Sequence, residues 1–160
     1  FAFLAAVREF WQGLLVLGGA ISSGAGILAS QILGADFAYM GTRFISSKES
    51  LAKPEYKAML VDSVAKDIIN TAAFTGIPNN MLRQSIEKAG FDPDNIPSSA
   101  KSKLNFDDPH SGAKAWRDIW SAGHGVGEVK EILSVKEIVA SLTTQYQETL
   151  QKPIITRRFI

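Results

Sequence analysis

Residues 13–44 constrain the fold of this chain more than any other stretch. Two short apolar runs, residues 14–17 and 37–40, are each followed by glycine, at Gly18-Gly19 and at Gly41. The sequence between them, residues 24–33, has the composition of a helix. Short apolar runs bounded by glycine are typical of buried parallel strands, and a helix joining two such strands forms a right-handed crossover. The sequence therefore predicts a strand–helix–strand unit with a glycine turn after each strand.

The two glycine turns are the first candidate binding site. A glycine turn exposes backbone N–H groups without a side chain in the way, and such groups bind phosphate well beside a helix N-terminus. Because both turns follow parallel strands, they should lie side by side at the edge of the sheet where ligands bind in α/β proteins. The alternative is that the turns only reverse the chain, since Gly18-Gly19 completes neither common nucleotide-binding fingerprint.

The stretch GGAISSGAGILASQILGADFAYMGTRFISSKES resembles the nitronate monooxygenase family, also called 2-nitropropane dioxygenases. These enzymes are FMN-dependent (β/α)₈ barrels, in which the loops after strands seven and eight hold the FMN phosphate. The resemblance implies cofactor-binding roles for five residues of this chain. They are Gly18, Gly19, Met40, Gly41 and Thr42.

A second glycine-rich motif, SAGHGVG at residues 121–127, breaks a predicted helix at 116–120. It follows a helix rather than a strand, which argues against a dinucleotide turn. It is similar to a turn that folds towards the flavin in nitronate monooxygenases and in flavin-dependent enoyl-acyl-carrier-protein reductases. The resemblance implies that Gly123 and His124 lie near the cofactor, although His124 stands where glutamine is common and an ordinary surface histidine is the alternative. The family's catalytic base matches no position here, so we assign no catalytic residue.

Two parallel strands alone cannot bury both faces of a sheet, and a complete (β/α)₈ barrel needs typically about 250 residues. The resemblance implies an α/β fold that forms the C-terminal part of an FMN-binding TIM barrel, with its last two strands and a helical C-terminal extension. Residues 1–66 would hold the last β/α units and the phosphate-binding loops. Residues 67–160 would form the mostly helical extension, with a mobile loop near 91–112. A complete small α/β domain is the alternative.

Capping signals and apolar spacing predict the remaining elements. Ser46 with Glu49, and Ser134 with Glu137, each match a capping box at a helix start. Arg83 is expected on a solvated or salt-bridged helix face. Residues 67–78 are expected to be extended and to end in a turn. Further helices are expected at residues 1–12, 55–65, 79–89 and 134–150.

Composition excludes several classes of site. The 160 residues carry 17 basic and 16 acidic side chains, and no basic patch with interleaved aromatic residues indicates nucleic acid binding. The absence of cysteine excludes disulfides and thiolate metal sites. Asp107, Asp108 and His110 lie close together, but three potential ligands in one loop are weak evidence, so we expect no metal site. No apolar run is long enough for a membrane span. We expect a cytoplasmic protein that acts on a small molecule and forms, at most, a homo-oligomer.

The resemblance implies an FMN-dependent oxidoreductase that oxidises alkyl nitronates with O₂. A flavin-dependent enoyl-acyl-carrier-protein reductase, or another NAD(P)H-dependent flavin oxidoreductase on the same barrel, is the alternative among flavoenzymes. A phosphosugar-binding barrel would share the phosphate site without a flavin. An alternative of another class is a non-catalytic barrel fragment that self-associates to cover its sheet edge.

Overall fold

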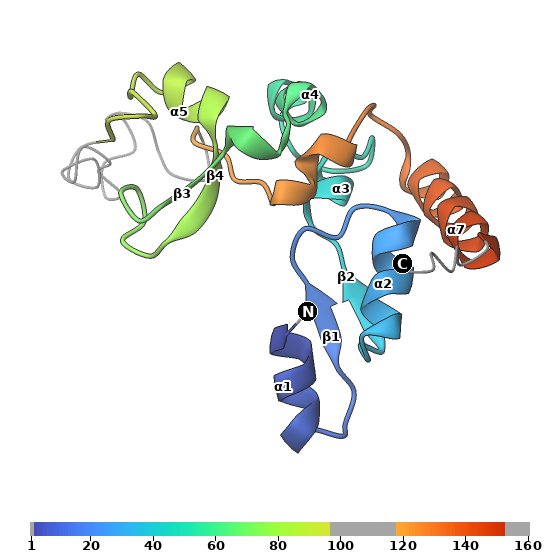
Figure 1. The fold of residues 1–160 in the computed structure, drawn as a ribbon. Helices are drawn as coiled ribbons and strands as arrows, with labels where there is room; N and C mark the ends of the chain where they lie inside the picture. Colours follow the sequence, from blue (N-terminus) through green and yellow to red (C-terminus); the bar gives the residue numbers. More distant parts are fainter. Residues whose placement is uncertain (1, 97–117, 153–160) are drawn as a thin grey trace, which may run out of the picture.

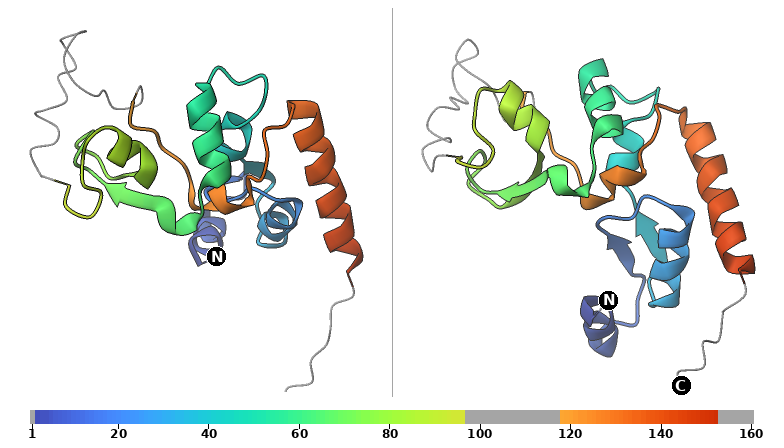
Figure 2. Two further views of the ribbon diagram at one scale, coloured as in Figure 1. Left: turned by 90° about the horizontal axis from the view of Figure 1, so that it is seen from above. Right: turned by 45° about the horizontal axis from the view of Figure 1, so that its top comes forward.

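The computed structural model describes residues 2–96 and 118–152. Two regions with different sheets lie on different sides of a central group of short helices, the hairpin to the left and the parallel sheet below in Figure 1. One region contains helix α1 (Ala2–Phe10) and a parallel sheet covered by helix α2 (Gly24–Ile32). The other contains an antiparallel hairpin followed by helix α5 (Arg83–Lys88). The C-terminal helix α7 (Val135–Gln151) lies alongside α2 (Figure 2).

The predicted strand–helix–strand unit is confirmed. Strand β1 (Val16–Gly18) pairs in parallel with strand β2 (Phe37–Tyr39), and Ser23 caps the intervening helix α2 by accepting the Gly26 N–H. The strands are less buried than their apolar sequence predicts. Val16 and Phe37 are 56% and 57% exposed, because α2 covers one face of the sheet and no described residue covers the opposite face.

Helix α1 is held mainly by polar contacts. Arg8 forms an ion pair with Asp36 at 2.7 Å and donates to the Gly34 carbonyl, and Asp36 also accepts the Leu15 N–H at 2.8 Å. The Leu15 N–H, and then the Arg8 guanidinium, hold the pKa of Asp36 below its usual value. This helix buries little apolar surface, since among its large apolar side chains only Leu4 is buried.

Helices α3 (Thr42–Ile45) and α4 (Pro54–Asp62) occupy the centre, followed by the 3₁₀ helix η1 (Ala65–Asp67). The predicted helix start at Ser46 and Glu49 is wrong. Ser46 lies at the end of α3, where its hydroxyl donates to the Arg43 carbonyl at 3.0 Å. The Glu49 carboxylate instead accepts the Val135 N–H at 2.9 Å and so caps α7. A rule based on spacing along the chain cannot detect such a distant partner.

The hairpin contains strands β3 (Ile68–Thr71) and β4 (Asn79–Leu82), paired antiparallel with Ile68 opposite Leu82. The extended piece predicted from residue 67 is confirmed for β3. The helix predicted over 79–89 is wrong in its first turn, which is β4, and α5 begins only at Arg83. Arg83 pairs with Asp94 at 2.7 Å, as expected of a salt-bridged helix face. Among the described residues after 67, strand β4 therefore stands where the start of a helix is expected.

A short extended piece at residues 119–121 lies along β4 and replaces the helix expected at 116–120, of which residues 116 and 117 lie outside the described residues. The Leu82 N–H donates to the Trp120 carbonyl at 2.8 Å, and Met81 forms an antiparallel β-bridge with Ser121. A cluster of buried apolar side chains forms the core of this region. It consists of Phe74, Met81, Ile86 and Ile119.

Helix α7 begins at the predicted capping box. The Ser134 hydroxyl accepts the Glu137 N–H at 3.2 Å, while the Glu137 carboxylate accepts the Ser134 N–H at 2.8 Å. The Ser134 hydroxyl and N–H, with the Lys48 ammonium, lower the pKa of Glu137 to about 2. At the other interface of α7, Gln145 accepts the Gly24 N–H at 2.9 Å and ties α7 to α2.

Several predictions lie outside the described residues. They concern the part of the predicted mobile loop beyond residue 96 and the group Asp107, Asp108 and His110. Within residues 2–96 and 118–152, no three acidic or histidine side chains are grouped to hold a metal ion. None of the helices in these two ranges has the length and apolar character needed to cross a membrane.

Candidate phosphate-binding site

A hollow of about 160 Å³ lies at the C-terminal ends of β1 and β2, where the sequence places the two glycine turns. Its walls come from three segments, two of which follow the parallel strands, while the third comes from the C-terminal half of the chain. The lining residues are Gly19, Ala20, Ile21, Ser22, Tyr39, Gly41, Thr42, Gly123 and Gly125.

The turn after β1 has an unusual backbone. Gly19 has φ +113° and Ala20 has φ +54°, both in the left-handed region. A residue other than glycine rarely adopts such a φ, and this strain is common at ligand sites. The N–H groups of Ala20, Ile21 and Ser22 make no hydrogen bond within the part of the chain that the structure describes. The turn therefore offers backbone donors to a ligand in the hollow.

The turn after β2 is open on the same side. No atom lies within 4 Å of where a Cβ on Gly41 would stand, and the same holds for Gly19, so a ligand can approach the backbone of both turns. Thr42 follows as the first residue of α3. Its Oγ1 accepts the Gly123 N–H at 2.8 Å, which leaves the hydroxyl proton of Thr42 available for donation.

The third wall is the glycine-rich turn that leads into the 3₁₀ helix η2 (His124–Glu128). Gly125 packs against the Ser22 hydroxyl and the Ala20 carbonyl so closely that a Cβ would overlap both. Together with the bond from Gly123 to Thr42, this contact joins the C-terminal turn to both glycine turns. The hollow is therefore built from segments far apart in the sequence.

Aromatic side chains support the third wall from behind. The partly buried Tyr56 hydroxyl donates to the Ser121 carbonyl, and its ring stacks on Trp120 with centroids 4.9 Å apart. Burial raises the pKa of the Tyr56 phenol, and the hydrogen bond to Ser121 opposes this in part. Lys88 stands over the Trp120 ring at 5.4 Å. These contacts link α4 and α5 to the residues that precede Gly123.

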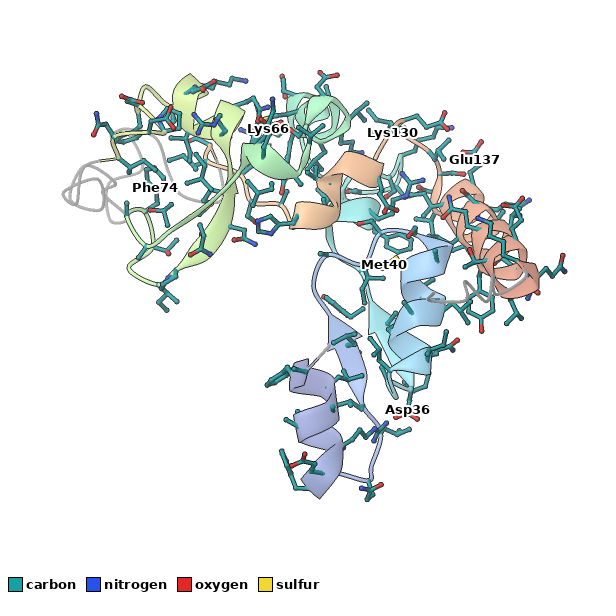
Figure 3. All side chains as sticks on the ribbon, viewed as in Figure 1. Asp36, Met40, Lys66, Phe74, Lys130 and Glu137 are labelled. Atoms are coloured by element: carbon teal, nitrogen blue, oxygen red, sulfur yellow. The ribbon has the colours of Figure 1, made fainter. Side chains whose placement is uncertain are left out.

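The structure brings together four of the seven residues that the sequence predicts as cofactor-binding: Gly19, Gly41, Thr42 and Gly123. The other three do not line the hollow. Gly18 is the last residue of β1 and pairs with Tyr39. Met40 is half-buried beyond the end of β2, below the central helices in Figure 3. His124 is exposed, with its Nδ1 3.5 Å from Asn80 Nδ2.

Sequence reasoning missed five lining residues: Ala20, Ile21, Ser22, Tyr39 and Gly125. Gly125 carried a detectable signal, because it belongs to the run of alternate glycines that indicates a close backbone approach. The left-handed backbone of Ala20 carried none, since alanine does not indicate a positive φ. Ile21 and Ser22 line the hollow because the left-handed backbone at Gly19 and Ala20 directs the following residues towards it.

The lining side chains are all uncharged, so the attraction for an anion would come from oriented N–H groups and from the Thr42 hydroxyl. The neighbouring Arg43 does not line the hollow. Its side chain is buried, and its Nε and Nη1 atoms have no hydrogen-bond partner among the described residues. Geometry and donor set therefore suit a phosphate held by backbone groups.

Comparisons with known proteins identify the family of this chain. Residues 11–145 match the sequence profile of a family described as nitronate monooxygenase. A probable nitronate monooxygenase of Staphylococcus saprophyticus is 32% identical over 113 residues, which are 67% of this chain and 32% of that protein. A nitronate monooxygenase of Paraburkholderia phytofirmans is 27% identical over 86% of this chain and 39% of its own length. The chain thus spans about a third of the length of these curated relatives.

Two solved structures are similar to this chain in fold. FabK from Thermotoga maritima superposes with a TM-score of 0.70 at 28% identity, covering 92% of this chain and 48% of that one. A nitroalkane oxidase from Streptomyces ansochromogenes superposes with a TM-score of 0.65 at 28% identity, covering 93% of this chain and 44% of that one. The chain belongs to the nitronate monooxygenase family, a family of flavin-dependent oxidoreductases.

Proposed function

We propose that this chain supplies the FMN phosphate site of a flavoenzyme that oxidises alkyl nitronates with O₂. In this proposal β1 and β2 are the last two strands of a (β/α)₈ barrel, and residues from 67 onwards form a C-terminal extension. The observation that carries the proposal is the hollow of about 160 Å³ in which two glycine turns meet the Gly123–Gly125 turn.

The residues present fit a phosphate. The missing Cβ atoms of Gly19 and Gly41 leave open space above both turns, and the N–H groups of Ala20, Ile21 and Ser22 stand without partners among the described residues. These groups, with the Thr42 hydroxyl, would hold the phosphate of FMN. The flavin would supply the electron transfer, and the chain would supply binding and orientation.

No described residue is assigned as the catalytic base. His124 is exposed and lies outside the hollow, so we place it no closer than the edge of the site. The exposed sheet face at Val16 and Phe37 supports the proposal that further strands cover this unit in the active enzyme. A small-molecule substrate follows from the proposed chemistry.

A second candidate is a flavin-dependent enoyl-acyl-carrier-protein reductase or another NAD(P)H-dependent flavin oxidoreductase. The similarity of this chain to FabK, with a TM-score of 0.70, is the observation that supports this second candidate. Both candidates use the same phosphate site, so the hollow does not choose between them. Steady-state oxidation of NAD(P)H would support the reductase, and flavin-dependent oxidation of nitronates with O₂ would support the monooxygenase.

The test is to titrate the purified chain separately with FMN and with riboflavin, which differ only in the phosphate. Flavin fluorescence and the visible spectrum after removal of excess ligand report binding. We expect FMN to be retained and riboflavin to be lost, with inorganic phosphate competing against FMN. Equal binding of the two flavins would contradict the phosphate site. A chain that self-associates on gel filtration and retains no flavin would instead support the non-catalytic alternative.

A further inference from the structure

Tyr39 belongs both to the phosphate hollow and to the uncovered face of the parallel sheet. Among the described residues that line the hollow, it is the one with an aromatic side chain, and it is 69% exposed. Tyr39 is the last residue of β2, and because side chains alternate along a strand it lies on the same face as the exposed Phe37. The hollow therefore has an accessible aromatic ring at the point where it meets the sheet.

Gly18 leaves the space in which this ring lies. The two strands pair with Gly18 opposite Tyr39. A Cβ on Gly18 would stand 3.6 Å from both Cβ and Cδ1 of Tyr39, which is an ordinary contact, whereas a longer side chain would extend into the ring. The backbone of Gly18 is outside the left-handed region, so its conformation does not require glycine. The structural role of glycine here is the room that it gives to Tyr39.

A phosphate monoester held by the glycine turns must direct its organic part out of the hollow. The Gly125 backbone closes one side, because it packs tightly against Ser22 and Ala20. On the side of Tyr39 an exposed ring is available, and its hydroxyl forms no hydrogen bond within the described residues. Exposed tyrosine rings bind flat groups by stacking. The ligand chemistry that suits both parts is a phosphate monoester that carries an aromatic ring.

We propose that Tyr39 is a platform on which the aromatic ring of a phosphate monoester stacks, and that Gly18 is the positioning residue that leaves room for it. The identification of this ring as a flavin rests on the proposed function, whereas the platform does not. Tyr39 is then a specificity-determining residue. Inorganic phosphate and alkyl phosphates occupy the hollow without using the platform, and only an aromatic ester gains from it.

The experiment compares two probes, phenyl phosphate and methyl phosphate, which present the same phosphate group with and without a ring. Isothermal titration calorimetry measures their dissociation constants with the purified chain, at a pH at which both are dianions. We expect phenyl phosphate to bind about tenfold more tightly than methyl phosphate, as is typical for stacking on one aromatic side chain. Equal affinities, or no binding of phenyl phosphate, would overturn the proposal.

A pair of aromatic residues on the same sheet face locates the platform. Tyr39→Ala should abolish the preference for phenyl phosphate and leave the affinity for methyl phosphate unchanged. Phe37→Ala is the matched control, because Phe37 is exposed on the same strand but does not line the hollow, so the preference should persist. A preference that survives Tyr39→Ala would place the ring elsewhere, such as the adjoining hollow of about 310 Å³ beside Asn79 and Asn80, and would overturn the platform.

Two substitutions of Gly18 test the positioning role. Gly18→Ala adds a methyl group at an ordinary 3.6 Å from Tyr39 and should keep the preference for phenyl phosphate. Gly18→Leu should displace the ring and remove the preference, while methyl phosphate still binds. Circular dichroism checks that both variants fold. An unchanged preference in Gly18→Leu would contradict the positioning role.

An FMN titration of the same samples separates this inference from the proposed function. FMN capture together with equal binding of the two phosphate esters would refute the platform and leave the flavin proposal standing. A preference for phenyl phosphate that depends on Tyr39, without FMN capture, would support the platform and count against the flavin proposal.

Discussion

The parallel-sheet region and the hairpin region bury their apolar side chains to very different extents. In the hairpin, Phe74 and Ile86 are fully buried, whereas in the parallel sheet Phe37 is 57% exposed. The hairpin packs onto helix α5 and onto residues 119–121, so its apolar core lies within this region. The parallel sheet has one covered face, and parallel sheets are normally covered on both. The region that carries the candidate site is thus the one that most needs a further partner.

The largest difference between the regions should appear when one phenylalanine is removed from each. Phe74→Ala should lower the free energy of unfolding by about 3–5 kcal/mol, because it leaves a cavity and removes the edge-on contact with Phe91. Phe37→Ala should change it by less than about 0.5 kcal/mol, as for most exposed sites. Urea unfolding followed by circular dichroism measures both. Similar losses would show that the sheet face is covered in solution.

The next effect tests how tightly the third wall joins the glycine turns. Gly125→Ala should destabilise the chain by about 1–3 kcal/mol and weaken FMN capture, since the new methyl group would overlap the Ser22 hydroxyl and the Ala20 carbonyl. Gly127→Ala is the matched control, because its methyl would meet Val64 Cα at an ordinary 3.8 Å. Urea unfolding and flavin fluorescence report the two effects. Equal behaviour of the two variants would argue against the close contact.

A smaller effect concerns the support behind that wall. Tyr56→Phe removes the donor to the partly buried Ser121 carbonyl and should cost about 1–2 kcal/mol of unfolding free energy. Tyr39→Phe, in the exposed sheet, removes a hydroxyl that forms no hydrogen bond within the described residues, so it should be nearly neutral. Urea unfolding compares the pair. A neutral Tyr56→Phe would mean that water replaces the lost donor.

The smallest effect is a pH dependence at the start of α7. The pKa of Glu137 is about 2 in the folded chain against an ordinary 4.5, so its ionised form stabilises the fold above pH 4.5. That contribution should fade as the pH drops from 4.5 towards about 2. Glu137→Gln should flatten this part of a stability–pH profile measured by urea unfolding. Glu148→Gln in the same helix, which forms no ion pair within the described residues, should leave the profile unchanged.

The sequence predicts the parallel unit well because its signals are local. Glycine after each apolar run, and a Ser cap at Ser23, specify strand, turn and helix without distant contacts. The Ser134–Glu137 capping box succeeds for the same reason. Four of the predicted site residues meet in the hollow because they lie in these locally specified turns or in a glycine motif with a recognisable spacing.

Predictions fail where a distant partner decides the structure. Asn79 and Asn80 suit a helix cap, yet residues 79–82 pair with β3 on one side and with residues 120–121 on the other. Cross-strand pairing outweighs intrinsic propensity, which is a weak prior. Glu49 likewise has a distant partner, since it caps a helix 86 positions away. The strained backbone of Ala20 could be found only from coordinates, since alanine does not indicate a positive φ.

The bond from Gly123 to Thr42 also has a consequence for the order of folding. It joins residues 81 positions apart. Closing so long a loop has an entropic cost that is offset only by contacts formed later in folding. The hairpin, with its short loop, can form early, while the hollow waits for the C-terminal turn to arrive. On the ribosome both glycine turns would emerge well before the wall that completes them. Phosphate binding would then indicate that the Gly123–Gly125 turn has packed against the two glycine turns.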